Sequence, residues 1–355
     1  MKPNSVKASI HGSVIDIFCG CGALTHGFFR EGFKIACGYD IDESCRYPFE
    51  TNNDAPFVCQ NVSTLSPRAV AREFNAGLPR ILMGCAPCQP FSAYSRNQRD
   101  SKWTLLLDFS RLVKAIKPEI VSMENVPRLR GFQGGQVFDQ FVNDLDEAGY
   151  EVRWKVVYCP DFGVPQNRYR LVLIASRLGT PLLPEPVRKK HEYTVVRDAI
   201  DGLSKLEAGE SDSLDPLHKC SRMSELNLKR IRASVPGGTW LDWDESLLAA
   251  CHKVSSGQSF HNVYGRMRWD QPSPTITTQF YAIGHGRFGH PEQDRALSLR
   301  EGALLQSFPL SYKFLKIGTE VVMQRIARQI GNAVPISLAQ AIARAIKLHL
   351  QDLGA

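Results

Sequence analysis

Apolar and polar positions alternate along the first half of the chain in a pattern that predicts strands separated by helices. Six short apolar runs have the character of buried strands. They are residues 14–18, 35–40, 80–83, 119–123, 152–157 and 171–175. Residues 105–116 repeat apolar side chains at a helical period, and 137–148 do the same. This alternation predicts an α/β fold with a doubly wound, mostly parallel sheet.

The pattern changes after residue 176, which predicts a second part of different architecture. Residues 177–290 lose the alternation and carry prolines, a basic cluster and the glycine-rich loop 235–238. Helical periodicity returns in 297–305 and 335–350. We therefore expect an α/β domain over 1–176, a small irregular domain over 177–290, and a C-terminal segment, 291–355, that returns to the first domain.

Composition excludes several classes of protein. With 43% hydrophobic and 22% charged residues among 355, the chain is neither disordered nor fibrous. Ten cysteines are too few for a disulfide scaffold, and no apolar run reaches the length of a membrane span or resembles a signal peptide. We expect a cytoplasmic protein with reduced thiols. The net charge of +7 suits a polyanionic partner.

A glycine turn follows the first predicted strand. Gly20 and Gly22 would let a ligand approach the backbone closely, and the next helix would present free N–H groups to it. Asp40 ends the second predicted strand, where a carboxylate can accept both hydroxyls of a ribose. The alternative is a tight strand–helix turn without function, because short glycine loops are common.

A cysteine between prolines follows the third strand. Cys88 would lie at the carboxyl edge of a parallel sheet, where such folds bind ligands. Cys85 and Cys88 form C-x-x-C, but the chain has no second pair that would suggest structural zinc. A nucleophilic Cys88 is the better interpretation, and a buried cysteine without function is the alternative.

Further candidate residues lie beside the next predicted strands and the last predicted helix. Glu124 is a candidate proton donor, although such a residue more often forms a cap or an ion pair. Arg168 and Arg170 are two apart and would lie on one face of an extended segment, unless they form a solvated pair. Asn332 precedes the last predicted helix and could cap it or contact a cofactor.

Six motifs in order resemble the DNA cytosine-5 methyltransferases. They begin at Asp16 and end at Pro335: Asp-x-Phe-x-Gly-x-Gly, Pro-Cys-Gln-Pro-Phe-Ser, Glu-Asn-Val, Gln-Asn-Arg-x-Arg, Arg-Glu-x-x-x-Leu-Gln-x-Phe-Pro and Gln-x-Gly-Asn-x-Val-Pro. Only 177–290 lacks the resemblance, and there the family carries its target-recognition region. The resemblance implies the S-adenosylmethionine-dependent methyltransferase fold, with a catalytic and cofactor-binding domain over 1–176.

The family resemblance assigns catalytic roles. Cys88 would be the thiolate that adds to C6 of cytosine, so that C5 can attack a methyl sulfonium. Glu124 would hold N3 and the exocyclic amine. Arg170 matches the residue that contacts O2, and Arg168 would lie near the phosphate or the Cys88 loop. S-adenosylmethionine would supply the methyl group and leave as S-adenosylhomocysteine, and no metal is required.

The resemblance also implies a set of cofactor contacts. The residues are Phe18, Gly20, Gly22, Asp40, Ile41, Asn61, Val62, Pro87, Leu105, Asn332 and Ala333. Two of them depart from the family pattern. Ile41 stands where a large aromatic is frequent, and Asn61 where Asp is usual, although the Asn oxygen can still accept a hydrogen bond from the adenine amine.

DNA contacts are expected in two regions. The target base must be flipped from the duplex, and the polar segment after Cys88 resembles the mobile loop that closes over it; a plain surface loop is the alternative. Arginines of the middle segment would read bases or bind phosphates. The candidate DNA-binding residues are Gln89, Ser92, Arg96, Arg266, Arg268, Thr277 and Arg287.

Two other functions compete with DNA methylation. A related eukaryotic branch methylates transfer RNA with a similar cysteine motif, but the long segment between Arg170 and Arg300 favours DNA. A catalytically dead DNA-binding module is disfavoured because all the expected catalytic side chains are present. We expect a monomeric prokaryotic enzyme of restriction-modification type that acts on double-stranded DNA, associates with the nucleoid through it, and does not bind membranes.

Overall fold

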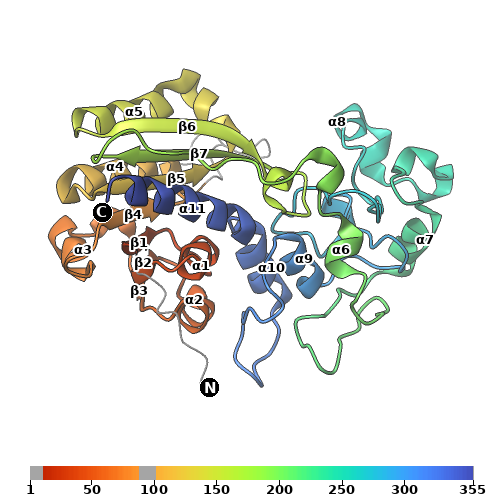
Figure 1. The fold of residues 1–355 in the computed structure, drawn as a ribbon. Coiled ribbons are helices and arrows are strands. Elements are labelled where there is room, and N and C mark those ends of the chain that lie inside the picture. The colour runs from red at the N-terminus through yellow and green to blue at the C-terminus, as the bar shows by residue number, and fades with distance from the viewer. Residues whose placement is uncertain (1–10, 88–100, 355) are drawn as a thin grey trace. The chain divides into compact units, whose positions relative to one another are not determined.

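The chain folds into two compact units in the computed structural model, which describes residues 11–87 and 101–354 (Figure 1). Within these residues, the first unit takes the chain up to 158, then 169–186, and then everything from 334 onward. We call it the sheet unit. The second takes 159–168 and 187–333, and we call it the loop unit.

The sheet unit is built on seven strands in the order β3-β2-β1-β4-β5-β7-β6. Their bounds are β1 (Ser13–Ile17), β2 (Lys34–Asp40), β3 (Phe57–Cys59), β4 (Arg80–Gly84), β5 (Ile120–Asn125), β6 (Glu151–Tyr158) and β7 (Tyr169–Ser176). Strands β3, β2, β1, β4 and β5 pair in parallel, and β7 is antiparallel to both of its neighbours. The predicted mostly parallel sheet is confirmed, and β3 is an additional strand.

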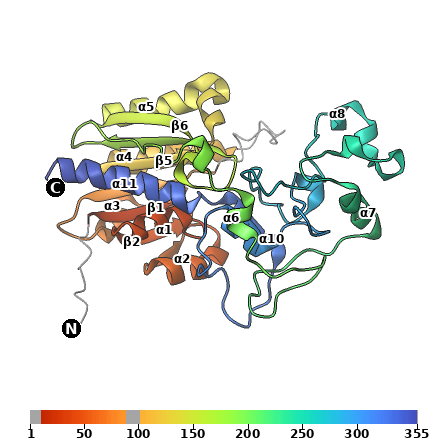
Figure 2. The same cartoon turned by 45° about the vertical axis from the view of Figure 1, so that its right-hand side comes forward.

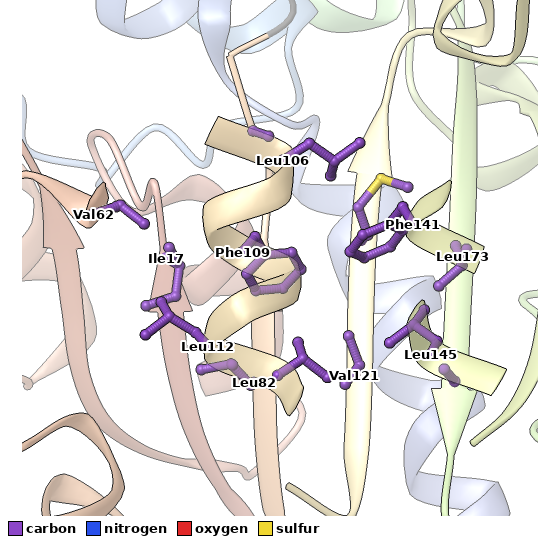
Figure 3. Packing of buried hydrophobic residues seen from close by; sticks show 14 of the residues in the cluster. Ile17, Val62, Leu82, Leu106, Phe109, Leu112, Val121, Phe141, Leu145 and Leu173 are labelled. Carbon is purple, nitrogen blue, oxygen red and sulfur yellow. The ribbon is translucent and has the colours of Figure 1, made fainter. Parts of the chain in front are cut away.

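Helices cover both faces of this sheet. They are α1 (Ala23–Arg30), α2 (Arg46–Asn53), α3 (Pro67–Glu73), α4 (Leu105–Ile116), α5 (Gln136–Glu147) and α11 (Ile336–Asp352). Helices α4 and α5 pack on one face, where Phe109 and Phe141 stack with ring centroids 5.9 Å apart (Figure 3). The predicted helices at 105–116, 137–148 and 335–350 are confirmed within two residues at each end.

Helices α1 and α11 pack against each other on the opposite face of the sheet. This contact links the N-terminal and C-terminal parts of the chain within the sheet unit. A Cβ on Gly27 would lie 2.4 Å from the Cβ of Ala339, so the two helix backbones are in close contact there. Arg344 and Gln340 add polar contacts to Glu31, at 3.0 and 2.9 Å. The C-terminal helix therefore completes the sheet unit, as the sequence predicted.

The loop unit contains short helices joined by long loops (Figure 2). The helices are α6 (Val196–Ile200), α7 (Glu225–Ala233), α8 (Ser255–Gln258), α9 (Leu299–Leu305) and α10 (Met323–Asn332). No strand longer than an isolated bridge occurs among its described residues. This irregular architecture matches the loss of periodicity after residue 176.

The boundaries of the two units differ from those expected from the sequence. The sheet unit extends to 186, not 176, and the chain returns to it at 334, not 291. Residues 291–333 belong to the loop unit because side chains of α9 contact loops of that unit. Arg300 pairs with Asp215 at 2.5 Å, and Gly302 packs so closely on Phe280 that a Cβ would lie 2.1 Å from its ring.

Candidate active site

The residues predicted to bind a cofactor in the sheet unit follow the carboxyl ends of four neighbouring strands. Phe18 follows β1, Asp40 ends β2, Asn61 lies just after β3, and Pro87 lies three residues after β4. Because these strands are parallel, their carboxyl ends share one edge of the sheet. The structure thus brings the four segments together at the edge where such sheets bind ligands.

The turn after β1 has an unusual backbone. Phe18 has φ 67°, a left-handed conformation that is rare for a bulky residue, and Gly20 and Gly22 have φ 51° and 87°. A Cβ on Gly20 would meet no atom within 4 Å, so open space lies against this glycine. A Cβ on Gly22 would lie 2.3 Å from Asn53 Nδ2, which makes glycine a packing requirement there.

Asp40 is held rigidly beside this turn. Its Oδ2 accepts a hydrogen bond from Gly20 N–H at 2.9 Å, and its Oδ1 accepts one from Asp42 N–H at 2.9 Å. Burial raises the pKa of Asp40, while these backbone hydrogen bonds oppose the shift. A fixed carboxylate beside an open glycine fits the ribose and methionine parts of an adenosyl cofactor.

The remaining predicted cofactor residues of this unit vary in exposure. Ile41 is 70% exposed, so an apolar surface is available beside Asp40. Asn61 is exposed and uses its Oδ1 to accept the Ser63 N–H at 3.0 Å, which leaves that oxygen one lone pair for another donor. Val62 is buried, and Pro87 and Leu105 are half-buried.

Asp16 was not predicted as a site residue, yet it lies buried directly below the glycine turn. Its Oδ2 accepts a hydrogen bond from Thr25 Oγ1 at 2.6 Å, and its Oδ1 has no hydrogen-bond partner in the described structure. Burial raises the pKa of Asp16 to about 8; Thr25 opposes this shift, and the charge of Asp40 adds to it. The sequence signal was its place at the start of the first motif.

We expect the raised pKa of Asp16 to make the protein less stable as pH increases. The unfolded state loses this proton near pH 4, but the folded state loses it only near pH 8. Between these pH values the unfolded state binds fewer protons, so the free energy of unfolding decreases as pH rises. Asp16→Asn removes the titration. In urea unfolding, the free energy of unfolding of the variant, relative to that of the wild type, should increase by roughly 1.4 kcal/mol per pH unit from pH 5 to 7. A difference independent of pH would contradict the shift.

Glu124 and Arg170 form a buried ion pair at the same sheet edge. Arg170 Nε lies 2.8 Å from Glu124 Oε1, and Glu124 is 2% exposed. The antiparallel register pairs Glu124 with Val172, so Arg170 lies diagonally opposite on the same face. Glu124 Oε1 is buried and, apart from the ion pair with Arg170, has no hydrogen-bond partner among the described residues.

Asn125 connects this pair to the segment that leads to Cys88. Its Nδ2 donates to the carbonyl of Ala86 at 3.0 Å, and its Oδ1 accepts from Val126 N–H. The Glu-Asn-Val motif contains this asparagine, but the sequence pattern indicates no role for it. The predicted nucleophile Cys88 and the loop residues Gln89, Ser92 and Arg96 lie outside the described residues.

Arg168 lies in a dense set of hydrogen bonds within the loop unit. It is buried in the loop unit and donates to Gln166 Oε1 at 3.1 Å and to the carbonyls of Ile276, Gly331 and Ala333 at 3.0, 3.4 and 3.5 Å. These contacts fasten three loop segments together. The structure therefore gives Arg168 a structural role within the loop unit, and its catalytic role stays a prediction.

Gln166 extends this network to two further motifs. Its Nε2 donates to Gln306 Oε1 at 3.0 Å, and Gln306 Nε2 donates to the carbonyl of Ile330 at 2.8 Å. Three motifs far apart in the sequence thus share one buried set of hydrogen bonds within the loop unit. Sequence reasoning missed this set because glutamine carries no pattern that predicts burial.

The other predicted residues near α10 belong to the loop unit. Thr277 is half-buried, and a Cβ on Gly331 would lie 2.5 Å from its carbonyl carbon. Glycine at 331 is therefore required for α10 to approach the Thr277 backbone. Asn332 is exposed at the end of α10, and Ala333 is buried.

Arg266, predicted to read DNA, is instead buried. It is 5% exposed, its Nε donates to the carbonyls of Ile231 and Ser234, and its Nη1 donates to those of His290 and Gln293. Its Nη2 forms an ion pair with Asp294. Because these donors are occupied within the loop unit, we interpret Arg266 as a structural residue and no longer as a DNA reader.

Arg268 and Arg287 remain candidates for DNA contact. Arg268 is exposed, whereas Arg287 is half-buried and donates to the carbonyl of Gly238 at 2.6 Å and to Asn262 Oδ1 at 3.0 Å. Burial, followed by the positive charge of Arg268, lowers the pKa of Arg287. Two neighbouring guanidinium groups that repel each other favour an anion between them.

The two kinds of arginine should differ when substituted. Arg266→Ala removes a buried guanidinium that donates to four carbonyls and pairs with the half-buried Asp294, so we expect a loss of about 3 kcal/mol in the free energy of unfolding. Arg268→Ala should leave stability unchanged and weaken DNA binding. Thermal unfolding and DNA titration of both variants test this. Equal stability of the Arg266 variant and the wild type would contradict the structural role.

In residues 11–87 and 101–354, no cluster of three or more His, Cys, Asp or Glu side chains could hold a metal ion. No helix in the described part of the chain is both long and apolar enough to cross a membrane.

The fold and site define the class of protein. A seven-stranded sheet with this strand order, a glycine turn after β1 and an acidic residue ending β2 is the S-adenosylmethionine-dependent methyltransferase fold. The chain belongs to the C-5 cytosine-specific DNA methylase family, whose model matches residues 12–348. It is therefore a DNA cytosine-5 methyltransferase.

Individual relatives and solved structures agree with this family. The chain is 50% identical to the type II methylase M.HgiDII of Herpetosiphon aurantiacus over 96% of its own length and 97% of the relative. It is 35% identical to the type II methyltransferase M1.HphI of Haemophilus parahaemolyticus, over 94% and 86%. A putative prophage-encoded DNA modification methyltransferase of E. coli has the same fold, with TM-score 0.75, 23% identity and coverage of 97% and 100%.

Proposed function

We propose that this enzyme transfers a methyl group from S-adenosylmethionine to C5 of a cytosine flipped out of a specific double-stranded DNA sequence. The observation that carries the proposal is the buried pair of Glu124 and Arg170, beside the segment that Asn125 fastens to β5 and that continues into Cys88. A base in an intact duplex could not reach a buried carboxylate at a sheet edge, so the reaction requires flipping.

Cys88 would act as the nucleophile. Its thiolate would form a bond to C6 of the ring, which makes C5 nucleophilic enough to take the methyl group. Loss of the C5 proton would then expel the thiolate and restore the aromatic ring. Glu124 Oε1, which lies beside Arg170 and has no hydrogen bond among the described residues, would accept one from the exocyclic amine or from protonated N3.

The cofactor would bind along the edge formed by β1 to β4. Asp40 would accept the ribose hydroxyls, the open face of Gly20 would admit the methionine part, and Ile41 would lie against adenine. When bound, S-adenosylmethionine supplies an electrophilic methyl group. The protein would only have to place that methyl group over C5 and exclude water.

The relatives suggest the biological setting. Both type II relatives are named for enzymes of restriction-modification type, so we propose that this enzyme protects a specific sequence in such a system. Arg268, Arg287 and Thr277 are our candidates for DNA contact in the loop unit. We propose that the enzyme works as a monomer in the bacterial cytoplasm, on nucleoid DNA.

The proposal is tested by bisulfite sequencing of DNA from a methylation-deficient host that expresses the chain. We expect 5-methylcytosine at one short recurring sequence. Transfer RNA from the same cells should carry no new 5-methylcytosine. Modified transfer RNA together with unmodified DNA would overturn the proposed substrate.

A further inference from the structure

Cys85 contacts the carboxylate of Glu124. It follows β4 directly and is half-buried, and its thiol donates a hydrogen bond to Glu124 Oε2 at 2.8 Å. The parallel register between β4 and β5 pairs Gly84 with Met123, so the next residues along the two strands, Cys85 and Glu124, are neighbours. The contact therefore follows from the sheet itself.

The two oxygens of Glu124 have different surroundings. Oε2 is occupied by the Cys85 thiol, whereas Oε1 lies beside the charge of Arg170 but accepts no hydrogen bond in the described structure. The terminal torsion of a glutamate is broad, so a carboxylate can rotate unless a contact fixes it. A hydrogen bond to one oxygen restricts that rotation and sets the direction of the other.

We propose that Cys85 is a positioning residue for Glu124, a role that rests on the proposed function of that glutamate. By holding Oε2, the thiol keeps Oε1 directed toward the cytosine ring and beside Arg170. It does not touch the substrate and forms no covalent bond in the reaction. A thiol is a weak donor, so its contribution is smaller than that of Glu124 itself.

Substitution of Cys85 tests this role through the rate of methyl transfer. We expect Cys85→Ala to slow the single-turnover rate constant about three- to tenfold, the range for one hydrogen bond from a weak donor. The KM for DNA and the Kd for S-adenosylmethionine should stay unchanged. Cys85→Ser, which keeps a donor of similar size, should recover most of the rate. Cys251→Ala, which removes an exposed thiol of the loop unit, is the matched control.

A double-mutant cycle separates positioning from a general structural effect. If Cys85 acts through Glu124, Cys85→Ala should slow a Glu124→Gln enzyme by less than twofold, since the carboxylate is already gone. An equal loss in both backgrounds would overturn the proposal, as would a wild-type rate for Cys85→Ala or a failure of serine to rescue. A wild-type rate for Glu124→Gln would instead overturn the proposed role of the glutamate.

Discussion

Cys88→Ala should abolish methyl transfer while leaving cofactor binding intact. Without a thiolate, nothing adds to C6, and C5 of cytosine is too weak a nucleophile to attack the methyl group unaided. We expect the single-turnover rate to fall by on the order of 10⁴-fold or more, the scale of loss when a nucleophile is removed. The cofactor contacts that we propose at Asp40 and Gly20 do not involve this side chain.

The measurement is transfer of a labelled methyl group to a duplex, together with the Kd for S-adenosylmethionine from calorimetry. A duplex containing 5-fluorocytosine provides a second readout. Fluorine replaces the C5 proton whose loss would release the thiolate, so the covalent adduct persists. Mass spectrometry should place that adduct on Cys88 in the wild type and find none in the alanine variant. An adduct on Cys85 would contradict the assignment, as would measurable turnover of the variant.

The sequence predicted the sheet unit well because periodicity decides structure there. Residues 105–116 repeat apolar side chains at the helical period, and they form α4 over those same residues. The strand β3 was missed because it has three residues, lies at the edge of the sheet and is only partly buried. Helix α10 was missed because its buried face includes Gln329 and Gly331, which are not apolar signals.

The loop unit was harder to predict because its contacts join residues far apart in the sequence. A sequence does not distinguish a buried arginine from an exposed one, so it predicts a DNA contact for Arg266 as readily as for Arg268. Its partner Asp294 and the carbonyl of His290 come from a segment more than twenty residues away. Similarly, Arg295 donates to the carbonyl of Leu206 and Arg300 pairs with Asp215, which explains why 291–333 stay in this unit, although their helical pattern suggested otherwise.

The edge of the sheet shows what a motif can and cannot supply. Ordered motifs predicted that Glu124 and Arg170 both act on the target cytosine, and the register of β5 and β7 explains how the two side chains come together. Motifs alone did not predict the hydrogen bond from Cys85, since it depends on the pairing of β4 with β5. Strand register, which a sequence does not state, therefore determines which oxygen of Glu124 the Cys85 thiol contacts.

Glu124→Gln should slow methyl transfer by about 10²–10³-fold, the usual loss when one well-placed electrostatic partner is removed. The amide has nearly the same shape, but it cannot balance positive charge on the ring, and it leaves Arg170 without a buried counterion. Because Glu124 lies outside the set of residues proposed to bind the cofactor, the Kd for S-adenosylmethionine should change little. Single-turnover rates and cofactor titration at one pH test this, with thermal unfolding as a check that the variant remains folded. A folded variant with a near-normal rate would show that Glu124 only pairs with Arg170 and takes no part in the reaction.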